Sequence, residues 1–185
     1  MGYTTIFAGQ YKLNKPLDDK TNELLQGLAR TRRMKRDPEI LEDLGFGKAE
    51  IFGIEGEFFI DPEKHDPFRN CPSVVDHNEP PATQPGLWLQ WVPTEDRQSL
   101  VWDKGEKFYE AGSWIIYLIE RILSPKGYVV NGIVNAQGQH RDDRWRIEVK
   151  GNKVSIKCGF SRKAPIPNFS QWYEELELDY EKNCG

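Results

Sequence analysis

The sequence predicts an α+β fold in which an antiparallel, tryptophan-rich sheet is packed by two helices. Three observations lead to this fold class. Short runs of β-branched and aromatic residues in the last third of the chain are separated by turn signals, as in a meander of strands. One segment, at about residues 107–123, repeats its apolar residues at helical spacing. Tryptophans are concentrated at residues 87–92 and 99–103, where they suit the core of a sheet.

The two helices follow from apolar spacing and capping signals. The longer and strongly amphipathic helix, at about residues 107–123, carries apolar side chains at every third or fourth position, so one of its faces is apolar. The N-terminal helix, at about residues 18–32, begins at Asp18 or Asp19, because either carboxylate can accept hydrogen bonds from the free N–H groups of a first helical turn. Its apolar stripe is formed by Leu17, Leu24, Leu25 and Leu28.

Strands are expected before, between and after these helices. Residues 3–13 predict a first strand and residues 54–60 a second. Residues 87–92 are apolar on both faces, which is typical of a central strand covered on two sides, and residues 99–103 can pair with it. The last third predicts a meander whose final two strands are joined by a two-residue turn. Its strands are expected at 128–134, 144–150 and 153–159, with the turn at Gly151 and Asn152.

Length and composition predict one folded domain over residues 1–185. The 185 residues are 38% hydrophobic and 12% aromatic, which is too apolar for a disordered chain. A proline-rich loop at 61–86 and an acidic tail at 170–185 are expected as its irregular parts. Because the loop also contains apolar side chains, we expect it to be ordered and to wrap over the domain.

Charge and hydropathy exclude several kinds of partner. The 25 Lys and Arg residues stand against 29 Asp and Glu residues, and a net charge of −4 argues against duplex nucleic acid. No apolar run is long enough for a membrane span, and the N-terminus lacks the basic and apolar regions of a signal peptide. The three cysteines are odd in number and widely spaced, which indicates free thiols in the cytoplasm: Cys71, Cys158 and Cys184.

The familiar catalytic and cofactor motifs are missing. The sequence has no Walker-type phosphate loop, no GxGxxG, no GxSxG, no HExxH and no paired CxxC, so no cofactor is expected. His65 and His77 lie near three aspartates with which they could form a hard metal site. Since no spacing fixes the ligands, turn and loop roles are favoured and no metal is predicted; the aspartates are Asp61, Asp66 and Asp76.

The segment TRRMKR, residues 31–36, is the most distinctive local feature. Guanidinium groups grip phosphate or carboxylate in a bidentate manner, so this basic run predicts an anion site. The alternative is a solvated helix end whose charges satisfy the helix dipole and pair with nearby acids. Met34 within the run indicates that part of it is packed. The candidate ligand-binding residues are Arg32, Arg33, Lys35 and Arg36.

A second candidate site lies between residues 81 and 109, where polar groups are interleaved with indoles. Aromatic walls with a few placed polar groups suit a base or a sugar. The alternative, favoured for at least half of these tryptophans, is a place in the core with the indole N–H bonded to backbone. The candidate residues are Gln84, Trp88, Gln90, Trp91, Trp102 and Glu106.

Two pairs of carboxylates offer acid–base or metal chemistry. They are Asp103 with Glu106, and Asp142 with Asp143. Adjacent carboxylates in a hairpin loop point to opposite sides and are usually solvated. Whether either pair is catalytic or solvated stays open at this point.

Several unusual motifs occur in a fixed order along the chain: TRRMKR, IEGEFF, VVDHNEPPATQPGLWLQWVP, WDKGEKFYE and PKGYVVNGIVNAQGQHRDDR. In this pattern the chain resembles a family of short proteins encoded by tailed bacteriophages and prophages, over about residues 3–155. The resemblance implies a viral origin and an infected or lysogenic bacterial host, and it implies no particular reaction. The chain departs from the family pattern around residues 45–53 and in the long tail after Cys158.

Together these features predict an accessory protein that counters host defence by sequestering an anionic, nucleotide-derived small molecule. In this hypothesis arginines of the basic run bind phosphates and a tryptophan lies near the base. A second hypothesis is a protein-interaction module, or an inhibitor of a host protein, that uses the proline-rich loop or the acidic tail. A third is a nucleotide hydrolase or transferase that uses one of the carboxylate pairs. The sequence does not fix the oligomeric state.

Overall fold

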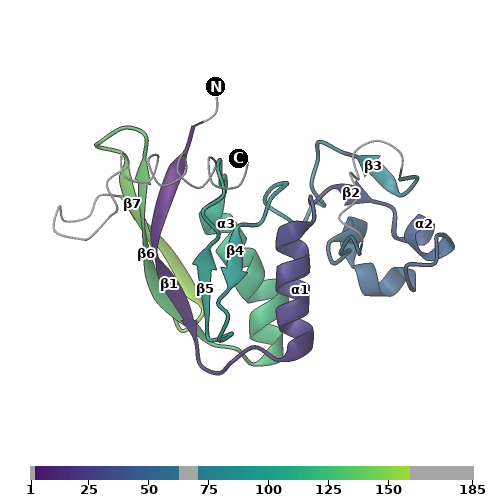
Figure 1. The fold of residues 1–185 in the computed structure, drawn as a ribbon, viewed down its shortest axis with the longest axis horizontal. Helices are drawn as coiled ribbons and strands as arrows, with labels where there is room; N and C mark the ends of the chain where they lie inside the picture. Colours follow the sequence, from purple (N-terminus) through teal and green to yellow (C-terminus); the bar gives the residue numbers. More distant parts are fainter. Residues whose placement is uncertain (1–2, 63–70, 159–185) are drawn as a thin grey trace, which may run out of the picture.

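The computed structural model describes residues 3–62 and 71–158. Its main feature is an antiparallel six-stranded sheet with the order β4-β5-β1-β6-β7-β8 (Figure 1). The predicted α+β class is therefore confirmed. The strands are β1 Thr5–Leu13, β4 Trp91–Pro93, β5 Ser99–Trp102, β6 Val130–Gly138, β7 Arg144–Lys150 and β8 Lys153–Cys158.

Two helical stretches pack on the same face of this sheet (Figure 1). The first is α1, Asp19–Arg30. The second is continuous over residues 111–126 and consists of α3 (Ala111–Tyr117), the π-helical turn η3 (Leu118–Leu123) and the 3-10 turn η4 (Ser124–Lys126). Their apolar faces and one face of the sheet form the core, which includes Leu25, Leu28, Trp91, Trp114, Ile115 and Val134.

The helix boundaries differ slightly from the predicted ones. The longer helix starts at Ala111 because Lys107 and Glu110 both have a left-handed backbone, with φ of 56°. α1 starts where the sequence indicates, since the carboxylate of Asp18 accepts a hydrogen bond from the backbone N–H of Thr21 at 2.8 Å. It ends at Thr31, whose backbone is extended.

A smaller unit, made of residues 35–60 and 71–79, lies at one end of the molecule (Figure 1). It has its own apolar cluster of Leu41, Phe52 and Phe59. The part of the proline-rich loop that is described pairs with the basic run here, since β3 lies antiparallel to β2. The elements of this small unit are β2 Lys35–Arg36, α2 Pro38–Asp43, η1 Ala49–Phe52, η2 Ile54–Gly56 and β3 Val74–Asp76.

The strand predicted at residues 54–60 is wrong. This segment forms the 3-10 turn η2 followed by a loop. Three successive backbone reversals prevent an extended strand, because Gly53, Glu55 and Gly56 all have positive φ, between 54° and 77°. The phenylalanines that suggested a sheet face pack inside the small unit and against the main core instead.

The central strand predicted at residues 87–92 is also wrong. Only Trp91–Pro93 pairs, and this strand, β4, stands at the edge of the sheet. Its apolar character has another cause, which is that α1 and α3 contact it. The expected pairing with residues 99–103 is confirmed, since Trp91 lies opposite Trp102.

The C-terminal meander is confirmed. β6, β7 and β8 pair in sequence, and the turn between the last two has Gly151 and Asn152 with φ of 53° and 68°. These values suit a primed two-residue hairpin turn, which matches the twist of the strands. The predicted acidic tail at 170–185 and Cys184 lie outside the described residues.

A candidate binding cleft

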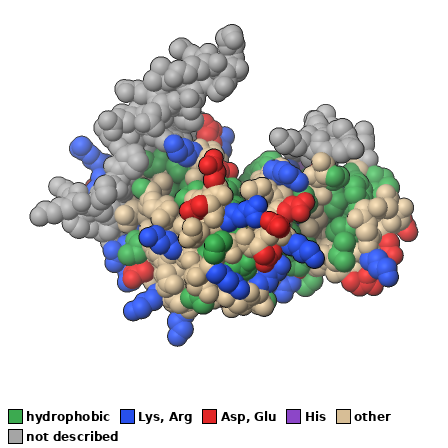
Figure 2. Space-filling model, turned by 60° about the horizontal axis from the view of Figure 1, so that its bottom comes forward, with side chains coloured by type: hydrophobic (Ala, Val, Ile, Leu, Met, Phe, Trp, Pro, Cys, Tyr) green, Lys and Arg blue, Asp and Glu red, His purple; other side chains and the backbone are tan. Residues whose placement is uncertain are grey.

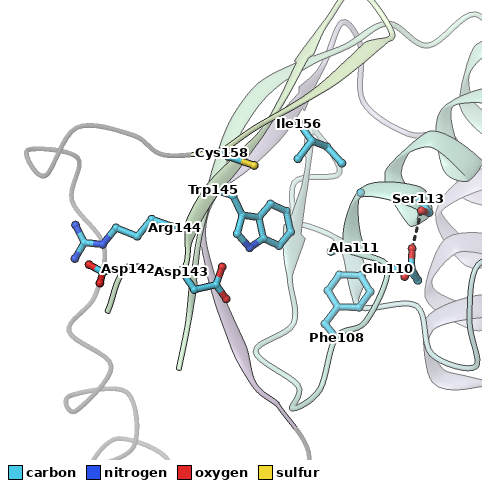
Figure 3. A pocket seen from close by; sticks show the side chains of 11 residues that line it. Phe108, Glu110, Ala111, Ser113, Asp142, Asp143, Arg144, Trp145, Ile156 and Cys158 are labelled. Carbon is cyan, nitrogen blue, oxygen red and sulfur yellow. Dashed lines mark hydrogen bonds between the residues drawn. The ribbon is translucent and has the colours of Figure 1, made fainter. Parts of the chain in front are cut away.

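A cleft of about 550 Å³ opens between the start of α3 and the ends of β7 and β8 (Figure 3). Its helix wall is formed by Phe108 and residues 110–113, and its strand wall by residues 142–145, Ile156 and Cys158. The walls meet where Gly112 lies against Ile156. A methyl group on Gly112 would come within 2.6 Å of Cδ1 of Ile156, so a larger residue there would require the isoleucine side chain to move.

Aromatic rings line the interior of the cleft. Trp145 projects from β7 into it and Phe108 faces it from the loop before α3 (Figure 3). Both rings contact Phe7 of β1 edge to face, with centroids 5.7 Å apart in each case. Phe7 in turn packs against Trp91 and Trp102. Trp145 is therefore the partly exposed end of the aromatic core, and its position is fixed by that core.

Carboxylates stand on both walls. Glu110 lies on the helix wall, where one of its oxygens accepts a hydrogen bond from the Ser113 hydroxyl at 2.9 Å (Figure 3). Asp143 lies on the strand wall beside Trp145, and one of its oxygens accepts a short hydrogen bond from the Tyr3 hydroxyl. Burial and this bond raise the pKa of the Tyr3 phenol, which therefore stays a donor at neutral pH. Each carboxylate keeps a second oxygen to which no other described residue donates.

Asp142 and Arg144 also border the cleft, in the turn before β7 and at its first residue. The side chains of Asp142 and Arg144 project from the other side of the strand wall, away from Trp145 (Figure 3). The Arg144 Nε donates to Gln137 at 2.6 Å, which holds the guanidinium there. The interior consequently combines an indole and a phenyl ring with two negative charges.

The carboxylates do not converge on a point. In residues 3–62 and 71–158, no three His, Cys, Asp or Glu side chains are grouped so that they could hold a metal ion. Of the five residues weighed as metal ligands, His65 and Asp66 lie outside the described residues. The chemistry that the cleft offers is aromatic stacking together with charge and hydrogen-bond acceptance from both sides.

The basic run lies elsewhere. The run ends in β2, and the strand wall of the cleft includes the start of β7. These two strands lie at opposite ends of the molecule (Figure 1). Arg33 is fully buried, and its guanidinium donates to Gln84 and to the backbone carbonyls of three residues, at 2.7 to 3.3 Å. Burial lowers the pKa of Arg33 to about 10, so it remains charged at neutral pH. The three carbonyls belong to Gly56, Glu57 and Phe59.

The other residues of the run have partners in the small unit. Arg36 is buried, donates to Ser73 at 3.0 Å and stacks over Phe59 at 4.4 Å. Lys35 forms an ion pair with Glu55 at 2.7 Å. Arg32 donates from Nε to the His77 carbonyl at 3.1 Å and reaches solvent. Its guanidinium carbon lies 5.8 Å from the ring centre of the exposed Trp88.

The candidate residues of the tryptophan-rich segment are divided between core and surface. Trp91 is buried and donates to the Ala111 carbonyl at 2.9 Å, and Trp102 donates to Gln90 at 3.0 Å. Gln84 belongs to a buried network in which it also bonds Tyr117. Of this group only Trp88 and Glu106 are exposed, and none of them lines the cleft.

Sequence reasoning singled out the pair Asp142 and Asp143, but it missed Glu110 and Trp145. A signal was present, because Asp143 directly precedes the strand predicted at 144–150 and lies two positions before Trp145, and residues two apart in extended chain share a face. Glu110 was not recognised because the predicted helix, at 107–123, included it. In the structure Glu110 directly precedes the helix, which begins at Ala111. The other pair, Asp103 and Glu106, lies in the loop after β5 and does not line the cleft.

Comparison with family models, with curated protein sequences and with solved structures finds no match to this chain. In the part of the chain that the structure describes, no helix has the length and apolar character to cross a membrane. The geometry of the cleft is consequently the main guide to function.

Proposed function

We propose that this protein is a binding protein whose cleft captures a small organic cation, such as a polyamine. The observation that carries the proposal is the placement of Glu110 and Asp143 on opposite walls of a cleft lined by Trp145. An amine over the face of an indole is attracted by the ring quadrupole, and this attraction is strongest for tryptophan. The two carboxylates supply charge and hydrogen-bond acceptors on both sides of the same ring.

The charge of the cleft separates this ligand class from others. A neutral sugar can stack on Trp145, but it leaves both carboxylates without a counter-charge. An anionic nucleotide would meet like charge on both walls. A single metal ion needs ligands that converge within about 2.0–2.6 Å of one point. An extended organic cation matches both the aromatic surface and the spread of negative charge.

A second candidate is the nucleotide-binding function expected from the sequence. The observation in its favour is that Arg32 lies over the exposed Trp88, so that a cation and a stacking surface adjoin, with Lys35 on the following strand. Arg33 and Arg36 do not contribute, because their guanidinium groups serve buried acceptors. This candidate therefore depends on a surface patch and not on the cleft.

We further propose that the protein acts in the cytoplasm of a bacterial host and withholds its ligand from a host process. The resemblance of the motif order to that expected of tailed-bacteriophage proteins, and the odd number of widely spaced cysteines, are the sequence features that support this proposal. Binding without turnover suits the role, since the sequence carries none of the catalytic motifs considered above.

Isothermal titration of the full chain with spermidine, AMP and glucose tests the two candidates together. The first candidate requires spermidine to bind one site per chain, with an affinity that falls as salt increases. AMP binding that is lost in Arg32→Gln supports the second candidate. If spermidine does not bind, the cation proposal is wrong.

A further inference from the structure

The small unit presents large apolar side chains to solvent. Leu44, Phe46, Ile51 and Ile54 are between 42% and 60% exposed, although they lie within eleven residues of one another in sequence. Figure 2 shows hydrophobic side chains gathered over this end of the molecule, with acidic side chains beside them. We call these four residues the apolar patch. Clusters of exposed apolar side chains commonly mark interaction surfaces.

The backbone holds the patch in place. Gly45, Gly47 and Gly53 have positive φ of 82°, 137° and 66°, a backbone conformation that glycine adopts most readily, so the chain changes direction at these positions. Gly47 lies against the Ile51 side chain, since a methyl group at Gly47 would come within 2.8 Å of its Cδ1. The ring of Phe46 rests on Phe59 with centroids 5.3 Å apart. A partner would therefore meet a preformed surface, which lowers the entropic cost of binding.

The surroundings of the patch are acidic. Between residues 38 and 54 the exposed charged residues are four acids and one lysine: Glu39, Glu42, Asp43, Glu50 and Lys48. The four negative charges and one positive charge give the surroundings of the patch a net charge of −3 from exposed groups. A surface of this kind favours a partner of opposite charge and suppresses partners of like charge.

We infer that this face docks a basic, amphipathic segment of another protein, with apolar side chains on the patch and Lys or Arg on the acidic rim. Charge argues against two other occupants. A second copy would bring an identical acidic rim against this one. The last sixteen residues of the chain hold five acids and one lysine, so they would also be repelled. The inference is independent of the cleft, because β7, which begins in its strand wall, and α2, beside the apolar patch, lie at opposite ends of the molecule (Figure 1).

Fluorescence anisotropy with a labelled Lys/Leu amphipathic peptide of about 16 residues tests the inference. The full chain is expected to bind it, and the double variant Ile51→Ser, Ile54→Ser to bind about tenfold more weakly or worse. A second double variant, Glu39→Gln with Glu50→Gln, should bind more weakly and with a smaller dependence on salt. Both pairs are exposed, so these variants should fold normally.

Matched controls locate the site. Ile133→Ser changes an isoleucine that is 45% exposed on β6, and Glu120→Gln an exposed glutamate on η3. Both should bind the peptide as the unaltered chain does. The inference is overturned if no peptide binds, if a Glu/Leu peptide binds equally well, or if all variants bind alike. It is also overturned if sedimentation shows a dimer that Ile51→Ser, Ile54→Ser abolishes, because the occupant would then be a second copy.

Discussion

Arg33 donates a hydrogen bond from Nη1 to the backbone carbonyl of Phe59 at 2.7 Å, in the interior of the protein. The same guanidinium reaches Gly56 and Glu57, so one side chain fixes the irregular segment that takes the place of a strand. Glu57 is itself buried and bonded to Tyr117 and Arg121 of the long helix. The small unit is thereby tied to the main core through charged groups.

The first prediction concerns the buried hydrogen bonds of Arg33. Arg33→Lys replaces a planar group that serves four acceptors by a single ammonium, and it leaves buried carbonyls without donors. We expect a loss of about 3 kcal/mol in the free energy of unfolding, measured by urea denaturation. The matched change Arg30→Lys, at the exposed end of α1, should cost less than about 0.5 kcal/mol. Equal effects of the two changes would show that the buried network does not stabilise the fold.

The second prediction concerns the close approach of β1 and β6. Gly9 has a φ of 126°, and a methyl group there would lie 2.3 Å from the Ile133 carbonyl oxygen. Because that atom belongs to the backbone, the paired strands themselves must move, and Gly9→Ala should cost about 2 kcal/mol or more. Gly86→Ala is the control, since its methyl would meet only Trp114 Nε1 at 3.7 Å. Thermal unfolding of both variants measures the difference.

The third prediction concerns acid stability. Hydrogen bonds from the Thr21 backbone and the Tyr128 hydroxyl lower the pKa of Asp18 from its ordinary value of 3.8 to about 2. A depressed pKa in the folded state stabilises the protein above the unfolded value and loses this effect as the pH falls toward 2. The stability difference between the unaltered chain and Asp18→Asn should therefore shrink between pH 5 and pH 2. A difference that stays constant over this range would contradict the assignment.

Local signals predicted the regular parts of the fold. The helical spacing of residues 107–123, the cap at Asp18 and the turn at Gly151 and Asn152 each depend on neighbours in sequence, and each is found near its expected place. The position of β4 at the sheet edge was not predictable in this way. Its apolar side chains are explained in part by contacts with α1 and α3, which come from other parts of the chain. The strand predicted at residues 54–60 was wrong for a similar reason. The carbonyls of Glu57 and Phe59 accept hydrogen bonds from Arg33, which is distant in sequence, and not from a neighbouring strand.

The candidate site was harder to predict because it is assembled from two segments about thirty residues apart in the sequence. Asp143 was visible as a member of a carboxylate pair, but nothing local indicates that Glu110 lies across from it. Conversely, the basic run was prominent in the sequence because its charges are dense, whereas two of its arginines serve internal acceptors. Residue type alone does not distinguish a buried structural arginine from one that binds a ligand.

The central claim is that Trp145 and Glu110 bind an organic cation from two sides of one cleft. Titration calorimetry with spermidine should show affinity about tenfold lower for Trp145→Leu, which keeps an apolar side chain but removes the indole face. Glu110→Gln, which keeps the acceptor for Ser113, should weaken binding severalfold. The controls Trp88→Leu and Glu120→Gln, both exposed and outside the cleft, should leave the affinity unchanged. Binding that survives both cleft changes, or that is lost in Trp88→Leu instead, would contradict the account.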